Sequence, residues 1–368
     1  MFRNGLLTST AMTAVAFLLS GAPADAKGTI TTFNVDGSSA TEAIAINARG
    51  VITGHFVDTV GNDVGFVRAP DGTITTFSAE GSSYTWPTCI NRQGFIAGHY
   101  AAPSGRDKFG FVRRANGEIK RFHVPGGSHR TYPSVINDSM TIAGFYDGRH
   151  GLSHSFVRSA GGTTITFDPV GAEASVVNGI NANGDVTGSY EDSAGIHGFV
   201  RTADGTITSF DPTGSQRTFS YAINGSNVIA GYFINGSGTT SSFVRASDGT
   251  ITTFDQPGSL GTKAYAINAK GAITGYYFDD LMQPHGFVRT PDGKMISFDP
   301  PKSTGTEAFE HQRQGRDHGL VQRQPRHPRL HPHAVSPLRR AGWREFIRRP
   351  LQGGMQTCSG TVFCFRRR

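Results

Sequence analysis

Apolar and polar residues of this chain recur with one fixed period. Turn pairs that precede Thr-Ile-Thr-type segments stand 43 to 45 residues apart, at Lys27-Gly28, Asp71-Gly72, Asn116-Gly117, Gly161-Gly162, Asp204-Gly205, Asp248-Gly249 and Asp292-Gly293. Ile-Asn pairs keep the same phase, at Ile46-Asn47, Ile90-Asn91, Ile136-Asn137, Ile180-Asn181, Ile223-Asn224 and Ile267-Asn268. A Phe-Val-Arg triplet recurs as well. Repeats of about 40–45 residues are typical of propeller blades.

Each repeat predicts four short strands, which we name a, b, c and d. In the sixth repeat these are Ala264–Asn268, Ala272–Tyr277, Gly286–Arg289 and Lys294–Phe298. The a–b connection, Asn-Ala-Lys-Gly, suits a tight hairpin because Asn can bond its own backbone and Gly tolerates positive φ. The c–d connection centres on Asp-Gly, a strong hairpin signal. The sequence therefore predicts an all-β fold, a β-propeller of four-stranded blades of about 44 residues, six intact plus a corrupted seventh.

Two further positions of the repeat predict how the blades pack. A glycine inside strand b usually marks close approach of another backbone, which we expect where blades crowd near the axis. Phenylalanines on strands c and d are expected to fill the space between neighbouring blades, each contributing roughly 1.5–3 kcal/mol when buried. The glycines are Gly54, Gly98, Gly144, Gly188, Gly231 and Gly275.

The residues before the strand c phenylalanine carry a resemblance to a known family. The triplets His154-Ser155-Phe156, His197-Gly198-Phe199 and His285-Gly286-Phe287 are similar to the His-Ala-Phe-like triplet of the HAF-type extracellular repeats. The resemblance covers residues 28–308. It implies a secreted bacterial β-propeller-like protein and adds no chemistry.

The start of the chain predicts export. Residues 1–26 read as a signal peptide, with Arg3, an apolar run from Leu6 to Leu19 and small residues at Ala24-Asp25-Ala26. The apolar run is too short for a bilayer of about 30 Å, so no membrane span is expected. Three cysteines cannot pair completely, and Cys89 is expected to be a small buried hydrophobic residue. We expect a secreted or periplasmic protein whose repeat domain covers residues 27–308.

The net charge of +7 is concentrated at one end of the chain. Residues 309–368 hold thirteen arginines and no lysine against three carboxylates, a net charge of +10, so the remainder carries −3. A basic composition confined to one segment does not indicate a nucleic-acid partner.

Residues 309–368 also lose the repeat, and we predict that they are a frameshifted, disordered basic tail. Dropping one base near codon 310 lets Glu310–Val321 read Ser-Ile-Asn-Ala-Lys-Gly-Ala-Ile-Thr-Gly-Leu-Tyr, close to Ala266–Tyr277. The histidines of the tail would then be accidental, and no metal site is predicted. An intact gene would encode seven units, and the lone strand at Gly28–Phe33 could complete the last blade.

One variable position stands out as a candidate ligand site. The d–a and b–c loops of such a propeller share a face, and here they vary while the other turns are nearly constant. The residue five before each Ile-Asn asparagine lies near the channel mouth: Glu42, Trp86, Tyr132, Val176, Phe219, Lys263 and Glu307. Aromatic residues there could stack on a sugar or grip a peptide, or could simply pack between blades. His55 and His99 share one strand b position, which half-burial explains without a ligand.

The predicted ligand-binding residues are Glu42, Trp86, Tyr132, Phe219 and Lys263. No nucleophile elbow, paired carboxylates, phosphate loop or calcium loop stands out, so no catalytic residue and no cofactor is predicted. The sequence favours an exported, non-catalytic propeller that binds a polysaccharide or an extracellular protein. A polysaccharide lyase or hydrolase on this scaffold, or a structural surface component, are the alternatives.

Overall fold

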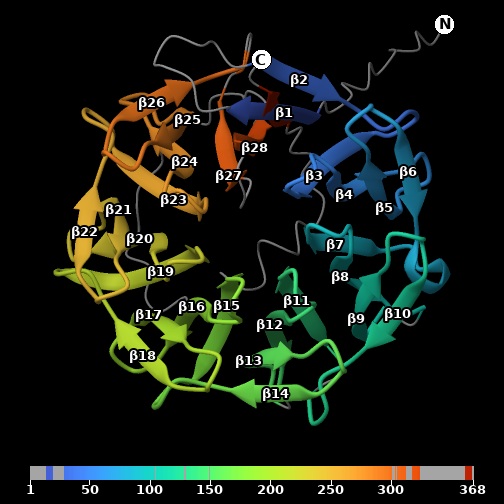
Figure 1. Cartoon of the computed structure of the whole chain (residues 1–368), viewed down its shortest axis with the longest axis horizontal. Coiled ribbons are helices and arrows are strands. Elements are labelled where there is room, and N and C mark those ends of the chain that lie inside the picture. Colours follow the sequence, from blue (N-terminus) through green and yellow to red (C-terminus); the bar gives the residue numbers. More distant parts are fainter. Residues whose placement is uncertain are drawn as a thin grey trace, which may run out of the picture.

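The computed structural model is a ring of antiparallel sheets around a central axis (Figure 1). It describes residues 14–19, 29–103, 105–127, 130–148, 150–300, 303, 305–311, 317–323 and 361–366. In six of the sheets the first strand lies innermost and the fourth outermost (Figure 1). The all-β propeller predicted from the repeat is confirmed, and seven blades fit the ring.

Six blades follow one another along the chain, each with four strands in the predicted order. Blades 1 to 3 are β3 (Ala40–Ile46), β4 (Ile52–Val57), β5 (Asp63–Arg68) and β6 (Ile74–Phe77); β7 (Thr85–Ile90), β8 (Ile96–Ala101), β9 (Lys108–Arg113) and β10 (Ile119–Phe122); and β11 (Thr131–Ile136), β12 (Ile142–Asp147), β13 (Ser153–Arg158) and β14 (Thr164–Phe167). Blades 4 to 6 are β15 (Ala174–Ile180), β16 (Val186–Glu191), β17 (Ile196–Arg201) and β18 (Ile207–Phe210); β19 (Ser215–Ile223), β20 (Ile229–Asn235), β21 (Thr240–Arg245) and β22 (Ile251–Phe254); and β23 (Gly261–Ile267), β24 (Ile273–Phe278), β25 (Pro284–Arg289) and β26 (Met295–Phe298). A 3-10 turn, η1 (Ala79–Gly81), joins blades 1 and 2.

The seventh sheet combines the two ends of the chain. Strands β27 (Glu307–His311), β28 (Asp317–Arg323), β29 (Thr361–Arg366) and β2 (Thr29–Phe33) pair antiparallel in that order, and β1 (Ala14–Leu19) pairs with β2, β28 and β29. The strand at the start of the repeats therefore completes the last blade, and β27 lies against β3 to close the ring.

The seventh sheet also differs from the predicted division of the chain. Where we expected a disordered tail from residue 309, β28 and β29 lie in the sheet, and β1 falls within the predicted signal peptide. A blade with missing strands leaves unpaired backbone groups at its edge, and the Thr-Val-Phe-Cys-Phe run of β29 has the β-branched and aromatic residues that favour a strand. Residues 324–360, most of the predicted tail, lie outside the described residues.

Phenylalanine pairs hold neighbouring blades together, as predicted. The strand c ring is completely buried in all six complete blades, and each packs edge-to-face on the strand d ring of the preceding blade at 5.9–6.3 Å between centroids. The arginine of the Phe-Val-Arg triplet covers the same strand d ring, with Arg201 4.8 Å above Phe167, for example. Phe33 of β2 makes this contact with Phe66, so the closing strand packs like every other strand d.

The strand b glycine does mark a close backbone approach, but the partner differs from our expectation. A Cβ at Gly54 would stand 1.9 Å from the carbonyl oxygen of Glu42, and the other five glycines would meet the equivalent oxygen at 1.9–2.2 Å. The approaching backbone therefore belongs to strand a of the same blade and not to a neighbouring blade. Strand a carries a bulge just after this point, at Ala43/Ala45 in blade 1, which turns the carbonyl toward strand b.

The Ile-Asn asparagines form a belt around one end of the channel. Asn47 Oδ1 accepts hydrogen bonds from the amides of Arg49 and Val51 and so shapes its own a–b turn. Its Nδ2 donates to the carbonyl oxygen of Asn91 in the next blade at 2.9 Å. The same inter-blade bond recurs from Asn91, Asn137, Asn181 and Asn224 at 3.1–3.3 Å. The belt explains why the Ile-Asn pair recurs in every repeat.

Candidate ligand site at the channel mouth

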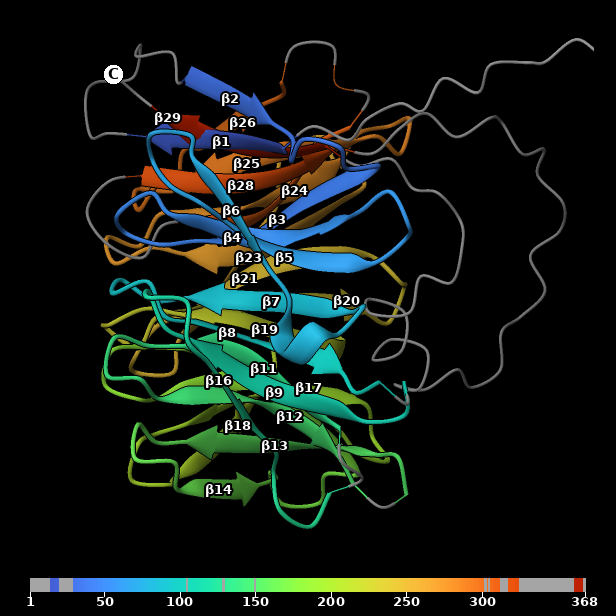
Figure 2. The same ribbon diagram turned by 90° about the vertical axis from the view of Figure 1, so that its right-hand side faces the viewer.

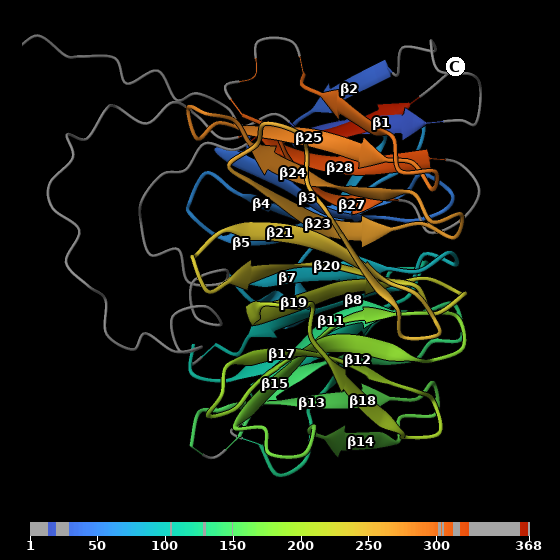
Figure 3. The same ribbon diagram turned by 90° about the vertical axis from the view of Figure 1, so that its left-hand side faces the viewer.

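The variable position predicted from the sequence lies at the end of the channel opposite the asparagine belt. Glu42 stands opposite His55 across β3 and β4, and Ala40, Val57 and Asp63 pair at the same edge of the sheet. Figures 2 and 3 show the ring from its sides, with turns gathered on two opposite faces. The start of strand a and the b–c loop thus share a face, which we call the mouth.

The mouth residues of strand a alternate around the ring with the strand b residues opposite them. The imidazole of His55 in blade 1 stacks on the indole of Trp86 in blade 2, with ring centroids 3.6 Å apart. His99 then meets Tyr132 edge-to-face at 5.1 Å, and Tyr132 stacks on Phe145 at 4.9 Å. Aromatic side chains at this position therefore pack between blades, which was one of the two readings left open. Trp86 and Tyr132 remain half-buried.

The other candidate residues divide into buried and half-buried ones. Val176 and Phe219 are buried in one apolar cluster with Tyr232. Lys263 is half-buried, with its Nζ 5.2 Å from the Tyr232 ring and 5.7 Å from the Tyr276 ring. Burial lowers the pKa of Lys263 and raises the pKa of Glu307 in β27, while the charge of each partly opposes the shift in the other. Of the five residues predicted to bind a ligand, four are half-buried and retain exposed surface at the mouth, whereas Phe219 is buried.

The two strand b histidines are buried and uncharged. His55 is 4% exposed and His99 is 1% exposed. Burial lowers the pKa of His55 to about 3 and that of His99 well below its usual value. Within the described part of the chain, His55 Nδ1 and both ring nitrogens of His99 have no hydrogen-bond partner. Buried polar atoms without partners are uncommon and often point to a site that holds a polar ligand or water.

Polar and charged side chains of blades 1 and 2 gather beside this aromatic row. His55 Nε2 lies 3.9 Å from Glu42 Oε2 and 3.6 Å from Asp63 Oδ1. Lys108 Nζ lies 3.6 Å above the ring of Tyr84, which itself stacks near Trp86 at 5.5 Å. Asp63, Tyr84 and Lys108 were not predicted, because they lie in a loop or at the first residue of a strand, where the repeat pattern gives no register. The sequence feature that could have pointed to these residues was the variability of the b–c and d–a segments.

The electrostatics of this group are strongly perturbed. Burial raises the pKa of Glu42 to about 7, with the charge of Asp63 adding to the shift. Burial, together with the charge of Arg130, lowers the pKa of Lys108 to about 8, although Asp63 opposes that change. Clusters of perturbed titratable groups are enriched at functional sites. Among the described residues no three His, Cys, Asp or Glu side chains are placed to hold a metal ion.

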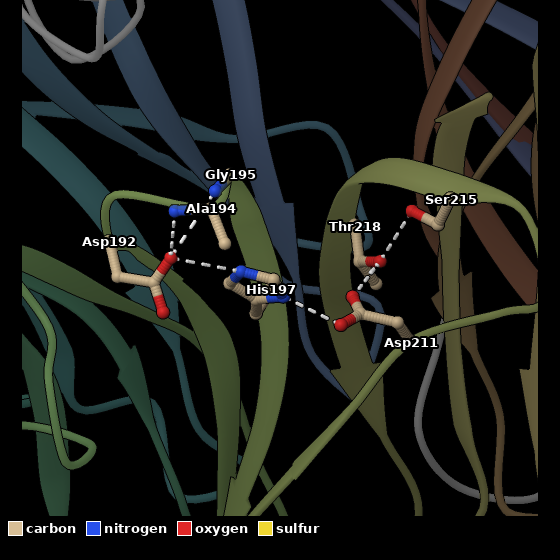
Figure 4. Close-up of polar contacts among 7 residues, drawn as sticks. All are labelled: Asp192, Ala194, Gly195, His197, Asp211, Ser215 and Thr218. Atoms are coloured by element: carbon tan, nitrogen blue, oxygen red, sulfur yellow. Dashed lines mark hydrogen bonds and ion pairs between the residues drawn. The ribbon is translucent and has the colours of Figure 1, made fainter. Parts of the chain in front are cut away.

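The triplet histidines belong to a separate network on the flanks of blades 3, 4 and 6. Figure 4 shows His197 with Nδ1 2.6 Å from Asp211 Oδ2 and Nε2 3.2 Å from Asp192 Oδ1, and with Asp211 accepting a hydrogen bond from Thr218 of the next blade. His285 repeats the two carboxylate contacts with Asp299 and Asp279, at 2.7 and 3.2 Å. In a catalytic triad the imidazole lies between carboxylate and hydroxyl, whereas here the carboxylate lies in between. The network therefore links loops and blades and holds no activated nucleophile.

His197→Phe is expected to lower the free energy of unfolding by about 1–3 kcal/mol at pH 6. Both ring nitrogens face carboxylates, which requires the imidazolium form, and phenylalanine keeps the packing on Tyr190. Partial burial pulls the pKa of His197 down, but the hydrogen bonds and charges of Asp211 and Asp192 outweigh it and raise the pKa. This stabilisation is complete below pH about 6.5 and is lost as the pH rises through the raised value.

Urea unfolding at pH 6 and pH 9 measures the difference. Ser241→Ala is the matched control, since Ser241 holds the equivalent position in blade 5 and does not titrate in this range. A loss of the same size at both pH values would contradict the imidazolium assignment.

A cavity of about 150 Å³ lies at the opposite end of the channel from the mouth residues. It is lined by the Ile-Asn pairs and a–b turns of the six complete blades, among them Asn91, Asn137 and Asn181. Five residues of extended chain separate it from the mouth, roughly 16 Å along each strand a. Because the belt asparagines bond to one another, their lining role is structural. The mouth therefore remains the candidate ligand site.

Comparison with known proteins supports the fold. No protein-family model matches the chain, and no curated protein matches it in sequence. Virginiamycin B lyase from Staphylococcus aureus has a similar structure, with a TM-score of 0.51, 13% identity, and coverage of 78% of this chain and 95% of that one. A catalytically inactive variant of that lyase with quinupristin has a TM-score of 0.53 and 13% identity, and the match covers 78% of this chain and 96% of that one. TolB from Acinetobacter baumannii has a TM-score of 0.43 and 10% identity, and the match covers 77% of this chain and 75% of that one.

At 13% identity, the likeness to the lyase extends to the scaffold alone. Within the described residues, no helix is both long and apolar enough to cross a membrane. The comparisons and the geometry together establish a β-propeller scaffold.

Proposed function

We propose that this protein is an exported, HAF-type propeller that binds a carbohydrate at the mouth of blades 1 to 3. The observation that carries the proposal is the broken symmetry of the repeat at that place. Packing demands the same residue type in every blade at the buried phenylalanine and at the belt asparagine. At the mouth, by contrast, blades 1 to 3 hold Glu42, Trp86 and Tyr132, while blade 4 holds Val176. A position that varies within a constant scaffold is free to serve recognition.

The chemistry of the mouth suits a sugar. Half-buried aromatic rings supply apolar contact, and adjacent charged and hydroxyl groups supply the few fixed hydrogen bonds that orient a polar ligand. Trp86, Tyr84 and Lys108 lie together in this way, from β7, its preceding loop and β9. An extracellular protein is the alternative ligand.

Export is supported by the seventh sheet as well as by the sequence. Removal of residues 1–26 takes β1 away and leaves β27, β28, β29 and β2, the same four-strand order as every other blade. A leader that is cleaved after Ala26 therefore leaves a complete ring, and a secreted or periplasmic location follows as part of the proposal.

Trp86→Ala and Tyr132→Ala are each expected to lower glycan affinity at least tenfold, because each removes apolar contact area at the mouth. A glycan array followed by titration of the best glycan measures the loss, with circular dichroism to confirm folding. Tyr277→Ala is the matched control, since this half-buried tyrosine lies on β24 and stacks on His285. The control should bind like the parent protein.

Unchanged binding in both mouth variants would remove the proposed site. Capture of an extracellular protein together with no glycan on the array would replace the carbohydrate by a protein ligand. Release of shortened oligosaccharides from the bound polymer would show the lyase or hydrolase that the sequence left as an alternative.

A further inference from the structure

We propose that the carbohydrate recognised at the mouth is an acidic one, a sugar bearing a carboxylate, held by Lys108, Arg130 and the hydroxyl of Tyr84. This inference rests on the proposed function and specifies its ligand. It begins with two cations that the backbone holds side by side. Lys108 at the start of β9 and Arg130 before β11 pair as an isolated parallel bridge, so their side chains leave neighbouring strands at one rim.

Of the two cations, Arg130 has a carboxylate partner at ion-pair distance, whereas Lys108 has none among the described residues. Arg130 Nη1 lies 3.7 Å from Asp147 Oδ2, beyond hydrogen-bond length, and its Nε donates to the backbone oxygen of Arg106 at 3.1 Å. Lys108 Nζ rests on the Tyr84 ring and, among the described residues, has no carboxylate oxygen within 4.0 Å. Like charges held together at a partly buried rim raise the free energy of the unbound site. An anion placed between them offsets that repulsion.

Tyr84 adds a neutral hydrogen-bond donor at the same place. Its Oη is buried and has no partner within the described part of the chain. Burial raises the pKa of Tyr84, and the charges of Asp63 and Glu42 add to the shift, so the hydroxyl keeps its proton at every physiological pH. A carboxylate accepts well from such a hydroxyl and from cationic donors together. The Trp86 and Tyr132 rings beside it supply the apolar contact for the sugar.

The acidic neighbours of the site do not exclude an anion. Glu42 has a pKa of about 7, and the pKa of Asp63 is raised chiefly by burial. At pH 6 Glu42 is therefore largely protonated, and an approaching carboxylate meets little charge from it. The titratable and charged groups facing the site, by element, are Glu42 (β3), His55 (β4), Asp63 (β5), Tyr84 (before β7), His99 (β8), Lys108 (β9), Arg130 (before β11), Tyr132 (β11) and Asp147 (β12).

The same groups set the direction of the pH dependence. Glu42 loses its proton as the pH rises through about 7, and Lys108 loses its charge as the pH rises through about 8. Both changes make the rim more negative, while the buried histidines stay neutral throughout. Affinity for an acidic sugar is therefore expected to fall between pH 6 and pH 9.

The test titrates the full chain by calorimetry with oligogalacturonate and, separately, with a neutral glucan of equal length. Oligogalacturonate is expected to bind at least tenfold more tightly at pH 6, and Lys108→Ala to weaken it about tenfold. Arg121→Ala removes one positive charge from the exposed outer strand of the same blade and should have no effect.

Equal affinity for the two oligosaccharides, or equal losses in Lys108→Ala and Arg121→Ala, would overturn the acidic ligand. Tight binding of neutral glycans that depends on Trp86 would overturn the inference and leave the carbohydrate-binding function standing. Failure of every glycan to bind would remove both.

Discussion

Gly188→Ala is expected to lower the free energy of unfolding by about 3 kcal/mol or more. A Cβ at Gly188 would stand 1.9 Å from the carbonyl oxygen of Val176, and 3.0 Å from a ring carbon of Phe199. A backbone oxygen paired into a sheet cannot move aside as a flexible side chain can. The two inner strands of blade 4 must therefore separate, or the Phe199 ring must leave the core it shares with Phe167.

Chemical unfolding measured by circular dichroism checks this loss. Gly225→Ala is the matched control, because a Cβ there has nothing within 4 Å and the backbone φ is not positive. The control is expected to unfold within about 0.5 kcal/mol of the parent protein, as surface substitutions do. An unfolding midpoint for Gly188→Ala equal to that of the control would mean that strand a is free to shift, and that the mouth carbonyl is not fixed by the glycine.

The outcome also bears on the candidate site. In each complete blade the oxygen that faces the glycine belongs to the mouth residue itself, such as Glu42 opposite Gly54 and Lys263 opposite Gly275. Because the glycine lets strand b approach that residue's backbone, it sets where the mouth side chain leaves the sheet. At the mouth position the backbone is therefore the same in all six complete blades, whereas the side chain varies.

Most of the fold could be predicted because the repeat records it locally. The a–b turn is a bond between Asn47 and its own next residues, and the c–d hairpin needs only its Asp-Gly pair. The phenylalanine pairs follow from their phase in the repeat. The seventh sheet could be predicted only in part, because its third strand, β29, comes from Thr361–Arg366, which carries no repeat signature.

Less of the site could be predicted, because its contacts cross between blades through the loops. Trp86 was singled out, yet its stacking on His55 depends on how two blades are set side by side. Lys108 and Tyr84 lie in segments where the repeat gives no register, so nothing in the sequence brings that ammonium over that ring. The identity of the mouth position could therefore be predicted, while its chemistry depends on the folded ring.

Asn47→Ala is expected to lower the free energy of unfolding by about 2–3 kcal/mol, because buried backbone groups on both sides of a blade interface lose their hydrogen-bond partner. Asn47 is 4% exposed, and its side chain bonds two amides of its own turn and the Asn91 carbonyl of the next blade. The half-buried Asn235 accepts the same pair of turn bonds, from Ser237 and Thr239, at a solvent-exposed turn, and makes no inter-blade bond with the described residues. Asn235→Ala is the control, and its expected cost is below about 1 kcal/mol because water can replace those bonds.

Asn47→Asp tests the inter-blade hydrogen bond separately from the two hydrogen bonds within the a–b turn. The carboxylate still accepts from the Arg49 and Val51 amides, but its second oxygen faces the Asn91 carbonyl, where the amide used to donate. This repulsion raises the folded-state pKa of the introduced carboxyl. At pH 7 the carboxyl is charged, and the loss of stability is expected to be largest. The variant is expected to regain stability as the pH falls through the raised pKa and the carboxyl takes up a proton. Stability equal to that of the parent protein at pH 7 would mean that the belt bond contributes nothing between blades. A loss at pH 7 that acid reverses would show that the asparagine couples neighbouring repeats and does more than shape its own hairpin.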